Sequence, residues 1–322
     1  MKTDLIIFLS YGVPSVVLYV LVVITVMRRR KALSSPFTNL FVITAIIDLF
    51  TYFHTYPSYR LMPEPFFFPY YVFIQQKAPF LGNLHVFLSG MFFYLQIGVA
   101  SLMTFNRFTA TVLPTKHKIW TDYFWRMTLS FLFVAVALSF ARLPLDVQVV
   151  YNPASNAYSF VNRIVPKTSY LLQLIYGILN SFVCLLMNGR ALIVLLRNRG
   201  SIGRHRVEHS LFIISIGIFI GQFSTSCINA MSVLNSFVFS SNAQLASLLQ
   251  VATPFASDVV TLTVPYYTLL AKGPIRNDIV RLMKSMFCKN LFCTVSSSPP
   301  SSTAAQATTI ITAQSTETRT RI

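Results

Sequence analysis

Asp48 and Asp258 are acidic residues that lie inside long apolar segments of the sequence. A charge in the middle of a bilayer is costly unless it is neutralised, paired or hydrated, so each carboxyl group needs a partner or a function. If the two acids face each other, they could share a proton or bind a cation. Alternatively, nearby Ser, Thr or Asn side chains hold each acid in a packing network. Both acids are therefore candidate members of an intramembrane polar network.

The other reactive groups do not suggest an enzyme. Asp258 follows "PFAS" and lacks the Gly-x-Gly turn of the intramembrane aspartyl proteases. His205 and His209 have a spacing that can bind zinc on a helix, but basic residues flank them and no third ligand is evident. Lys272 lies at the end of its apolar segment, where it does not suit a retinal Schiff base. We predict no catalytic residue, no metal site and no cofactor.

The segments that carry the two acids belong to a strongly apolar chain. Hydrophobic residues make up 54% of it and charged residues only 11%, whereas about a quarter of the residues are charged in soluble domains. A helix needs about 20 apolar residues to cross a bilayer. Seven segments satisfy this requirement: residues 5–27, 37–56, 78–105, 123–143, 168–196, 210–239 and 244–271. The predicted fold class is all-α, a seven-transmembrane helix bundle.

The distribution of Lys and Arg predicts the orientation of this bundle. Six of the 26 Lys and Arg residues fall on one side, namely Lys2, Arg60, Lys77, Arg142, Arg163 and Lys167. The other twenty (26 − 6) lie in or beside the loops of the opposite side, as is typical of the cytosolic face. The amino end is therefore expected outside. The net charge of +17 indicates membrane lipids with anionic head groups as partners, and no nucleic acid.

The chain after the seventh segment changes in composition, so we predict three regions. Residues 1–272 form the seven-helix transmembrane domain, residues 273–293 a short cytoplasmic amphipathic helix, and residues 294–322 a disordered Ser/Thr-rich tail. Cys288 and Cys293 are candidate palmitoylation sites beside the membrane. The last three residues, Thr320, Arg321 and Ile322, match a carboxyl-terminal ligand of a PDZ-domain protein.

This layout is that of G-protein-coupled receptors, and two stretches narrow the resemblance. "SLMTFNRFTATVLPTKHKIW" at 101–120 and "TPFASDVVTLTVPYYTLLAKGPIRNDI" at 253–279 resemble the nematode serpentine chemoreceptors, most closely class gamma. The resemblance covers residues 5–289. It implies a chemosensory receptor in the plasma membrane of sensory neurons or their cilia. Such a receptor detects a small odorant or pheromone and activates a heterotrimeric G protein.

The resemblance also implies a role for the end of the third segment. In the wider receptor class an acid, an arginine and an aromatic residue occur there, and the arginine passes from an internal partner to the G protein. Asn106, Arg107 and Phe108 occupy these positions, with Asn106 in place of the acid. They are the candidate G-protein-coupling residues. Without the resemblance, Arg107 would be interpreted as an anchor whose guanidinium extends to lipid phosphate.

The candidate ligand pocket consists of polar residues in the outer or middle parts of the predicted helices. A bundle pocket combines an apolar lining with a few such groups. The candidates are His85, Gln96, Arg142, Gln173, Tyr176, Asn180, Asn229 and Gln250. The outer cations Lys77, Arg142, Arg163 and Lys167 would suit a carboxylate-bearing ligand, or they are ordinary solvated loop charges. Residues 56–73, rich in Pro and aromatic side chains, are expected to form an interfacial lid.

A secondary transporter is the alternative function, because proton relays also use intramembrane acids such as Asp48 and Asp258. Transporters of this kind often consist of paired halves with broken helices, and such halves are not evident here. The sequence therefore favours the receptor.

Overall fold

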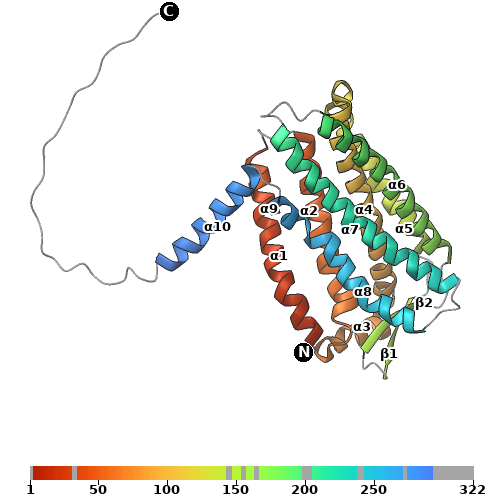
Figure 1. Cartoon of the computed structure of the whole chain (residues 1–322). Coiled ribbons are helices and arrows are strands. Elements are labelled where there is room, and N and C mark those ends of the chain that lie inside the picture. The colour runs from red at the N-terminus through yellow and green to blue at the C-terminus, as the bar shows by residue number, and fades with distance from the viewer. Residues whose placement is uncertain are drawn as a thin grey trace, which may run out of the picture. The chain divides into compact units, whose positions relative to one another are not determined.

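The structure is a computed structural model, and it describes residues 3–30, 35–142, 147–153, 157–162, 167–197, 205–237, 243–270 and 274–292. Helices dominate these residues (Figure 1). The long helices are α1 (Thr3–Arg28), α2 (Ser35–Thr55), α4 (Phe80–Val112), α5 (Ile119–Ser139), α6 (Lys167–Arg197), α7 (His205–Phe237) and α8 (Ala243–Leu262). Shorter elements are η1 (Tyr56–Arg60), η2 (Pro65–Phe67), α3 (Phe68–Lys77), η3 (Pro114–Lys116), η4 (Phe140–Arg142), α9 (Val264–Leu270) and α10 (Pro274–Phe292).

The long helices form the predicted all-α bundle. Six of them, α1, α2, α4, α5, α6 and α7, are long and apolar enough to cross a membrane. The predicted seventh segment contains α8 and α9, which a bend at Thr263 separates. Helix α4 lies at the centre of the bundle, since it packs against α2, α5, α6 and α7. It is also 33 residues long, so it connects the two ends of the bundle without a break.

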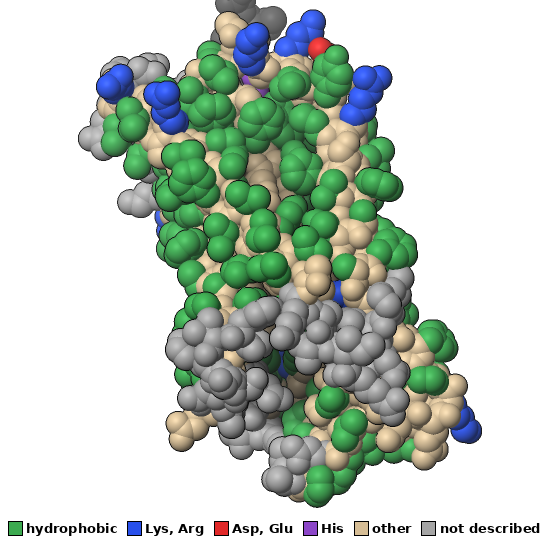
Figure 2. Space-filling model, turned by 90° about the vertical axis from the view of Figure 1, so that its right-hand side faces the viewer, with side chains coloured by type: hydrophobic (Ala, Val, Ile, Leu, Met, Phe, Trp, Pro, Cys, Tyr) green, Lys and Arg blue, Asp and Glu red, His purple; other side chains and the backbone are tan. Residues whose placement is uncertain are grey.

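The outer surface of the bundle suits a lipid environment. Large hydrophobic side chains point outward along the helices, and Phe133 of α5, for example, is 74% exposed. Figure 2 shows these side chains as a broad band, with most of the Lys and Arg side chains of that face gathered beyond its upper end. Exposed apolar area of this extent is unfavourable in water and favourable in lipid. The surface therefore agrees with an integral membrane protein.

One end of the bundle, which we call the hairpin end, carries a feature that the sequence did not predict. Strands β1 (Val147–Asn152) and β2 (Ala157–Asn162) form an antiparallel hairpin, with Val149 opposite Phe160. Met62, Tyr71, Ile74 and Val149 form a buried cluster between this hairpin and α3. Residues 56–73, which were expected to form a lid, fold into η1, η2 and the start of α3. Helix α3 then packs against β1 of the hairpin.

Tyr71 fixes this arrangement with both its ring and its hydroxyl. The ring stacks on Tyr158 of β2 with a centroid distance of 5.4 Å. The hydroxyl donates a hydrogen bond of 2.7 Å to the carbonyl oxygen of Pro57 in η1. Burial raises the pKa of the Tyr71 hydroxyl, so the group remains a neutral donor. The hairpin, α3 and the end of α2 are thereby tied together.

The opposite end of the bundle, which we call the Arg107 end, holds the start of α10. Ile275 and Ile279 are buried there, and Arg29 forms a salt bridge with Asp278. The chain divides into two compact units, Met1–Val280 and Arg281–Ile322, with the boundary inside α10. All features discussed below belong to the first unit. The side chain of Cys288 and all of residues 293–322, with Cys293 and the PDZ-type ending, lie outside the described residues.

Candidate functional site

A cavity of about 370 Å³ lies inside the hairpin end of the bundle. Helices α2, α4, α6, α7 and α8 contribute to its wall, and β2 contributes Ser159 and Phe160. The larger apolar side chains in the wall are Met62, Val86, Phe92, Phe93, Phe160, Ile228 and Val260. Polar groups interrupt this apolar lining at separate points. A cavity of this size and composition is typical of a small-molecule site.

Two histidines form the largest polar cluster of the wall. His54 of α2 and His85 of α4 stack with a centroid distance of 5.2 Å. The Nε2 atom of His54 lies 3.1 Å from the hydroxyl of Ser89, and the Nε2 atom of His85 lies 2.7 Å from the hydroxyl of Tyr70. Ser58 lies within hydrogen-bond distance of both imidazole rings. These bonds fix the ring positions, so the cluster presents an ordered polar surface to the cavity.

The cavity brings together five of the eight residues predicted for the ligand pocket. These five are His85, Gln96, Arg142, Gln173 and Asn229. The remaining three are Tyr176 and Asn180, which are not among the lining residues, and Gln250, whose side chain lies outside the described residues. Tyr176 donates to the carbonyl oxygen of Tyr94, and Asn180 accepts from Ser101, so both connect α4 to α6. Ligand binding by the five lining residues stays a prediction.

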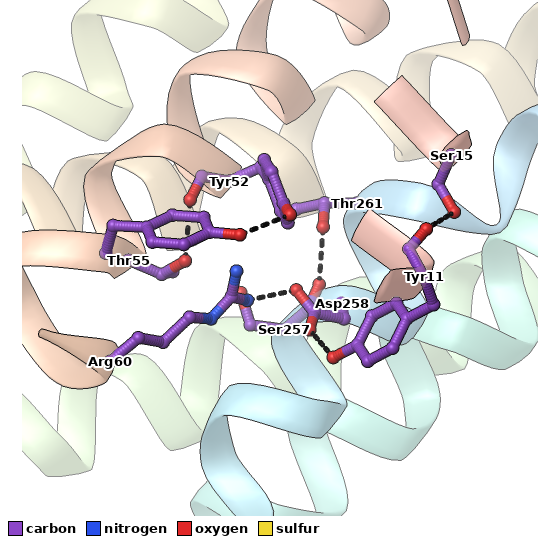
Figure 3. Close-up of polar contacts among 9 residues, drawn as sticks. Tyr11, Ser15, Tyr52, Thr55, Arg60, Ser257, Asp258 and Thr261 are labelled. Atoms are coloured by element: carbon purple, nitrogen blue, oxygen red, sulfur yellow. Dashed lines mark hydrogen bonds and ion pairs between the residues drawn. The ribbon is translucent and has the colours of Figure 1, made fainter. Parts of the chain in front are cut away.

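Asp258 lies beside this cavity, in a buried ion pair with Arg60 (Figure 3). Its neighbour Ser257 lines the cavity. The guanidinium of Arg60 points from η1 towards one carboxylate oxygen, and the hydroxyl of Tyr11 in α1 donates to the other. Both charged side chains are almost completely buried, with exposures of 0% and 6%. The pair thus joins α1, the extension of α2, and α8 inside the bundle.

Aromatic rings complete the surroundings of Arg60. Its guanidinium carbon lies 4.8 Å from the ring centroids of Phe8 and Tyr52, and 4.7 Å from that of Tyr56. Gly12 of α1 makes room for Tyr52, because a Cβ atom there would meet the Tyr52 hydroxyl at 1.8 Å. Rings at these distances attract a cation, and they also exclude water from the ion pair. The charge is therefore stabilised without reaching solvent.

From the sequence, Arg60 was expected on the outer side of the bundle, and its burial in an ion pair was not predicted. Residues Tyr56–Arg60 form a π-helical turn that continues α2, so Arg60 is carried into the bundle. The sequence did contain one indication of this burial, because Arg60 lies only four residues beyond Tyr56, the predicted end of the second apolar segment. Pro57 in between obscured it, because proline more often ends a helix than extends one.

Asp48 has different partners from Asp258. The hydroxyl of Tyr19 donates to one oxygen of Asp48 at 2.7 Å, and the side-chain amide of Gln96 donates to the other at 2.9 Å. Gln222 of α7 in turn donates to the backbone oxygen of Gln96 at 2.8 Å. Asp48 therefore connects α1, α2, α4 and α7 near the cavity wall. The two acids thus belong to separate hydrogen-bonded clusters, and none of the described hydrogen bonds joins them.

Arg107 is buried at the other end of α4, with an exposure of 3%. Its guanidinium carbon lies 4.1 Å from the ring centroid of Phe37 in α2, and it donates to the side-chain oxygen of Asn106 at 3.3 Å. Asn106 itself is fully buried, and Phe108 is half-buried. This burial contradicts the interpretation of Arg107 as an anchor that extends to lipid phosphate. The side chain lies between α4 and α2 instead.

The residues that follow Arg107 close the turn between α4 and α5. Trp120 at the start of α5 donates from its indole nitrogen to the Thr109 hydroxyl at 2.8 Å. The same hydroxyl donates to the backbone oxygen of Asn106 at 3.0 Å and lies 3.1 Å from Nδ1 of His117. Pro114 begins the short helical turn between them. The motif at 101–120 therefore has a structural basis, because its polar residues bond to one another across this turn.

No group of three metal-ligating side chains occurs among the residues that the structure describes. The side chains of His205 and His209 lie outside this part of the chain. Cys184 is buried in α6, and its sulfur donates to the Ser101 hydroxyl at 3.4 Å. The polar groups of the described bundle thus offer hydrogen bonds and charge to a small molecule.

Comparison with known proteins shows one consistent similarity. Residues 5–279 match the Srg family of chemoreceptors. Serpentine receptor class gamma-31 of Caenorhabditis elegans is 23% identical over 90% of this chain and 94% of its own length. Serpentine receptor class gamma-53 of the same organism is 23% identical over 85% of this chain and 90% of its own length. The matched region includes every helix from α1 to α9 and the start of α10.

Proposed function

Since the chain belongs to the Srg family of chemoreceptors, which resemble G-protein-coupled receptors, we propose that it binds a small molecule in the hairpin-end cavity and activates a heterotrimeric G protein. The ligand is an odorant or a pheromone in this proposal, and the receptor works in the plasma membrane of sensory neurons or their cilia. The cavity is the observation that carries the proposal. Its apolar wall with a few convergent polar groups is suited to a small organic molecule.

The orientation that this function requires has support from the exposed charges. Arg28, Arg30, Lys116, Lys118 and Arg197 are exposed at the Arg107 end. At the hairpin end, among the described residues, Arg60 and Arg142 are buried and Lys77 is exposed. Because cytosolic loops are enriched in Lys and Arg, we place the Arg107 end in the cytosol and the hairpin end outside. Ligand entry and G-protein contact then occur on the correct sides of the membrane.

Helix α4 offers a path between the two ends. Six of its residues between His85 and Gln96 line the cavity, and Arg107 lies about three turns beyond Gln96 on the same unbroken helix. Gln96 also bonds to Asp48 of α2, and its backbone oxygen accepts from Gln222 of α7. A ligand that displaces Gln96 would thereby act on three helices together. Small shifts of packed helices are a common form of receptor switching.

A cavity-filling variant tests the proposal in cells that express the receptor with a second-messenger readout. Once a screen has identified an active compound, Ser89→Phe in the cavity wall should abolish the response at normal surface level, because the ring occupies the ligand volume. Ser130→Phe is the matched control, since Ser130 is exposed on α5. Equal loss in both variants would contradict the cavity as the ligand site. Uptake of the compound without G-protein dependence would instead favour the transporter.

Other partners remain predictions from the sequence. Anionic lipids are expected at the cytosolic face, where the exposed cations lie. Palmitoylation at Cys288 or Cys293 and a PDZ-domain partner at Thr320–Ile322 are consistent with a cytosolic carboxyl end.

A further inference from the structure

We infer that Arg142 binds the anionic group of the ligand, so that the hairpin-end cavity selects a small monocarboxylate with an apolar body. The inference rests on the proposed function, because it takes the cavity as the ligand site. It goes further in assigning a ligand class and an anchoring residue. Four observations carry it: the burial of Arg142, the charges of the cavity wall, the space at Gly90, and the neighbouring groups on α6.

Arg142 is a buried cation that the described residues do not neutralise. It ends η4, is 8% exposed and lines the cavity. Its Nε atom donates to the hydroxyl of Ser169 at 3.2 Å, and its Nη1 atom donates to the backbone oxygen of Val86 at 3.4 Å. Both acceptors are neutral. Among the described residues, Arg142 has no carboxylate partner, in contrast to Arg60.

The rest of the cavity wall, as far as the structure describes it, contains no acidic side chain. None of its lining residues is Asp or Glu, and Arg142 is the only Lys or Arg among them. A buried cation is costly in a membrane protein unless an anion or several dipoles stabilise it. A ligand anion would therefore meet a buried positive charge and, among the described residues, no acidic side chain in the wall. An electrostatic attraction is strongest under those conditions.

The space around Arg142 is specific to this side chain. A Cβ atom on Gly90 of α4 would lie 2.7 Å from the Cδ atom and 2.9 Å from the Nε atom of Arg142. Glycine at position 90 therefore allows the guanidinium to lie across α4 and face the cavity. Alanine there would move the flexible side chain while leaving its charge in place. Gly90 thus provides a test of position that does not remove the cation.

Helix α6 places a second polar side chain in the same cavity wall as the guanidinium. Ser169 binds Arg142, and Gln173 lies one turn further on the same face of α6. Gln173 is a buried residue that lines the cavity. A planar carboxylate can accept two parallel bonds from a guanidinium, and the Gln173 amide can donate to the same group. Phe92, Phe93 and Ile228 then provide the apolar surface for the ligand body.

Binding to purified receptor tests this without any G protein. Octanoate and decanoate are the probes, octanamide and decanamide are their neutral matches, and the receptor is held in nanodiscs of phosphatidylcholine. We expect both acids to raise the thermal unfolding temperature at concentrations at least about tenfold lower than their amides. Arg142→Gln should remove this preference, and Gly90→Ala should weaken it. Arg126→Gln is the matched control, because Arg126 is exposed on α5, the helix that directly precedes η4 and Arg142.

Three outcomes would overturn the inference. One is equal stabilisation by acids and amides, and another is a carboxylate preference that persists in Arg142→Gln. In the third, phosphatidylglycerol added to the nanodiscs stabilises the receptor and octanoate then has no further effect. A lipid phosphate would in that case be bound to Arg142. The proposed function fails separately. In that case the acids bind as expected, yet neither they nor any screened compound stimulates nucleotide exchange on a G protein.

Discussion

Arg60 and Arg107 are both buried at opposite ends of the same bundle, but their contacts differ in kind. Arg60 forms an ion pair with Asp258, and three aromatic rings surround its guanidinium. Arg107 lies against the ring of Phe37 and donates to the neutral side chain of Asn106. A carboxylate attracts a guanidinium more strongly than an amide oxygen does in the same dielectric. The bond between Arg60 and Asp258 is therefore stronger than the bond between Arg107 and Asn106.

This difference agrees with separate roles for the two ends. The Arg60 pair joins α1, α2 and α8 around the ligand cavity, where a fixed geometry favours selective binding. In the proposed function, the bond to the neutral Asn106 would exchange for an acceptor on the G protein when the helices move.

Removal of one member of the buried pair should have the largest effect on stability. Asp258→Ala leaves the Arg60 charge inside the bundle without its carboxylate, so we expect a loss of about 3–5 kcal/mol. Thermal unfolding of the purified receptor and its surface level in cells would measure this loss. The double variant Arg60→Met with Asp258→Ala removes both charges and should recover most of it. Wild-type stability in the single variant would contradict the pairing.

Replacement of the other intramembrane acid should have a smaller effect, because no cation is left behind. Asp48→Asn keeps the shape, but one of the two oxygens that accept from Tyr19 and Gln96 becomes an amide nitrogen, which donates and does not accept. One buried donor then lacks an acceptor, which costs about 1–3 kcal/mol. Membrane insertion should persist, since an amide is cheaper to insert than an acid. Tyr19→Phe is the control that removes only the hydroxyl.

A result in which Asp48→Asn destabilises the receptor as much as Asp258→Ala would remove the contrast between the two clusters. A shifted dose response in Asp48→Asn, at normal surface level, is the expected functional sign. It follows from the bond between Asp48 and Gln96, because Gln96 also lines the cavity.

The smallest stability effect is expected at the turn beyond Arg107. Trp120→Phe keeps most of the buried ring and removes the indole donor to Thr109. We expect a loss of about 1 kcal/mol, the value of one neutral hydrogen bond. Trp125→Phe is the matched control, because Trp125 is 62% exposed on the same helix. A larger loss in the control than in Trp120→Phe would indicate that the turn does not depend on this bond.

The sequence predicted the bundle well because membrane-spanning helices appear in it as long apolar segments. Lipid offers no partners for backbone groups, so each run must form a helix. The family was also predictable, since the residues of 101–120 and 253–279 are specific and the family match covers residues 5–279. The hairpin was not predicted, because β1 and β2 are six residues each and lie between two stronger helical signals.

The site was predicted in part, and the missing part has a physical cause. Five polar residues of the cavity wall could be identified because polar side chains in apolar helices are rare and usually face inward. The ion pair of Arg60 and Asp258 could not be identified from the sequence. The two residues are 198 positions apart, and only the folding of the chain brings η1 and α8 together. Arg107 was found by resemblance, while its contact with Phe37 required the structure.

Nucleotide exchange with Arg107→Lys is the most direct test of the central claim that a ligand at one end of the bundle activates a G protein at the other. Lysine keeps the charge but lacks the planar group that stacks on Phe37 and offers several donors. We predict normal surface level and normal ligand binding, with most of the ligand-stimulated exchange on the G protein lost. Normal exchange in Arg107→Lys, measured beside unchanged binding, would contradict the role assigned to the Arg107 end.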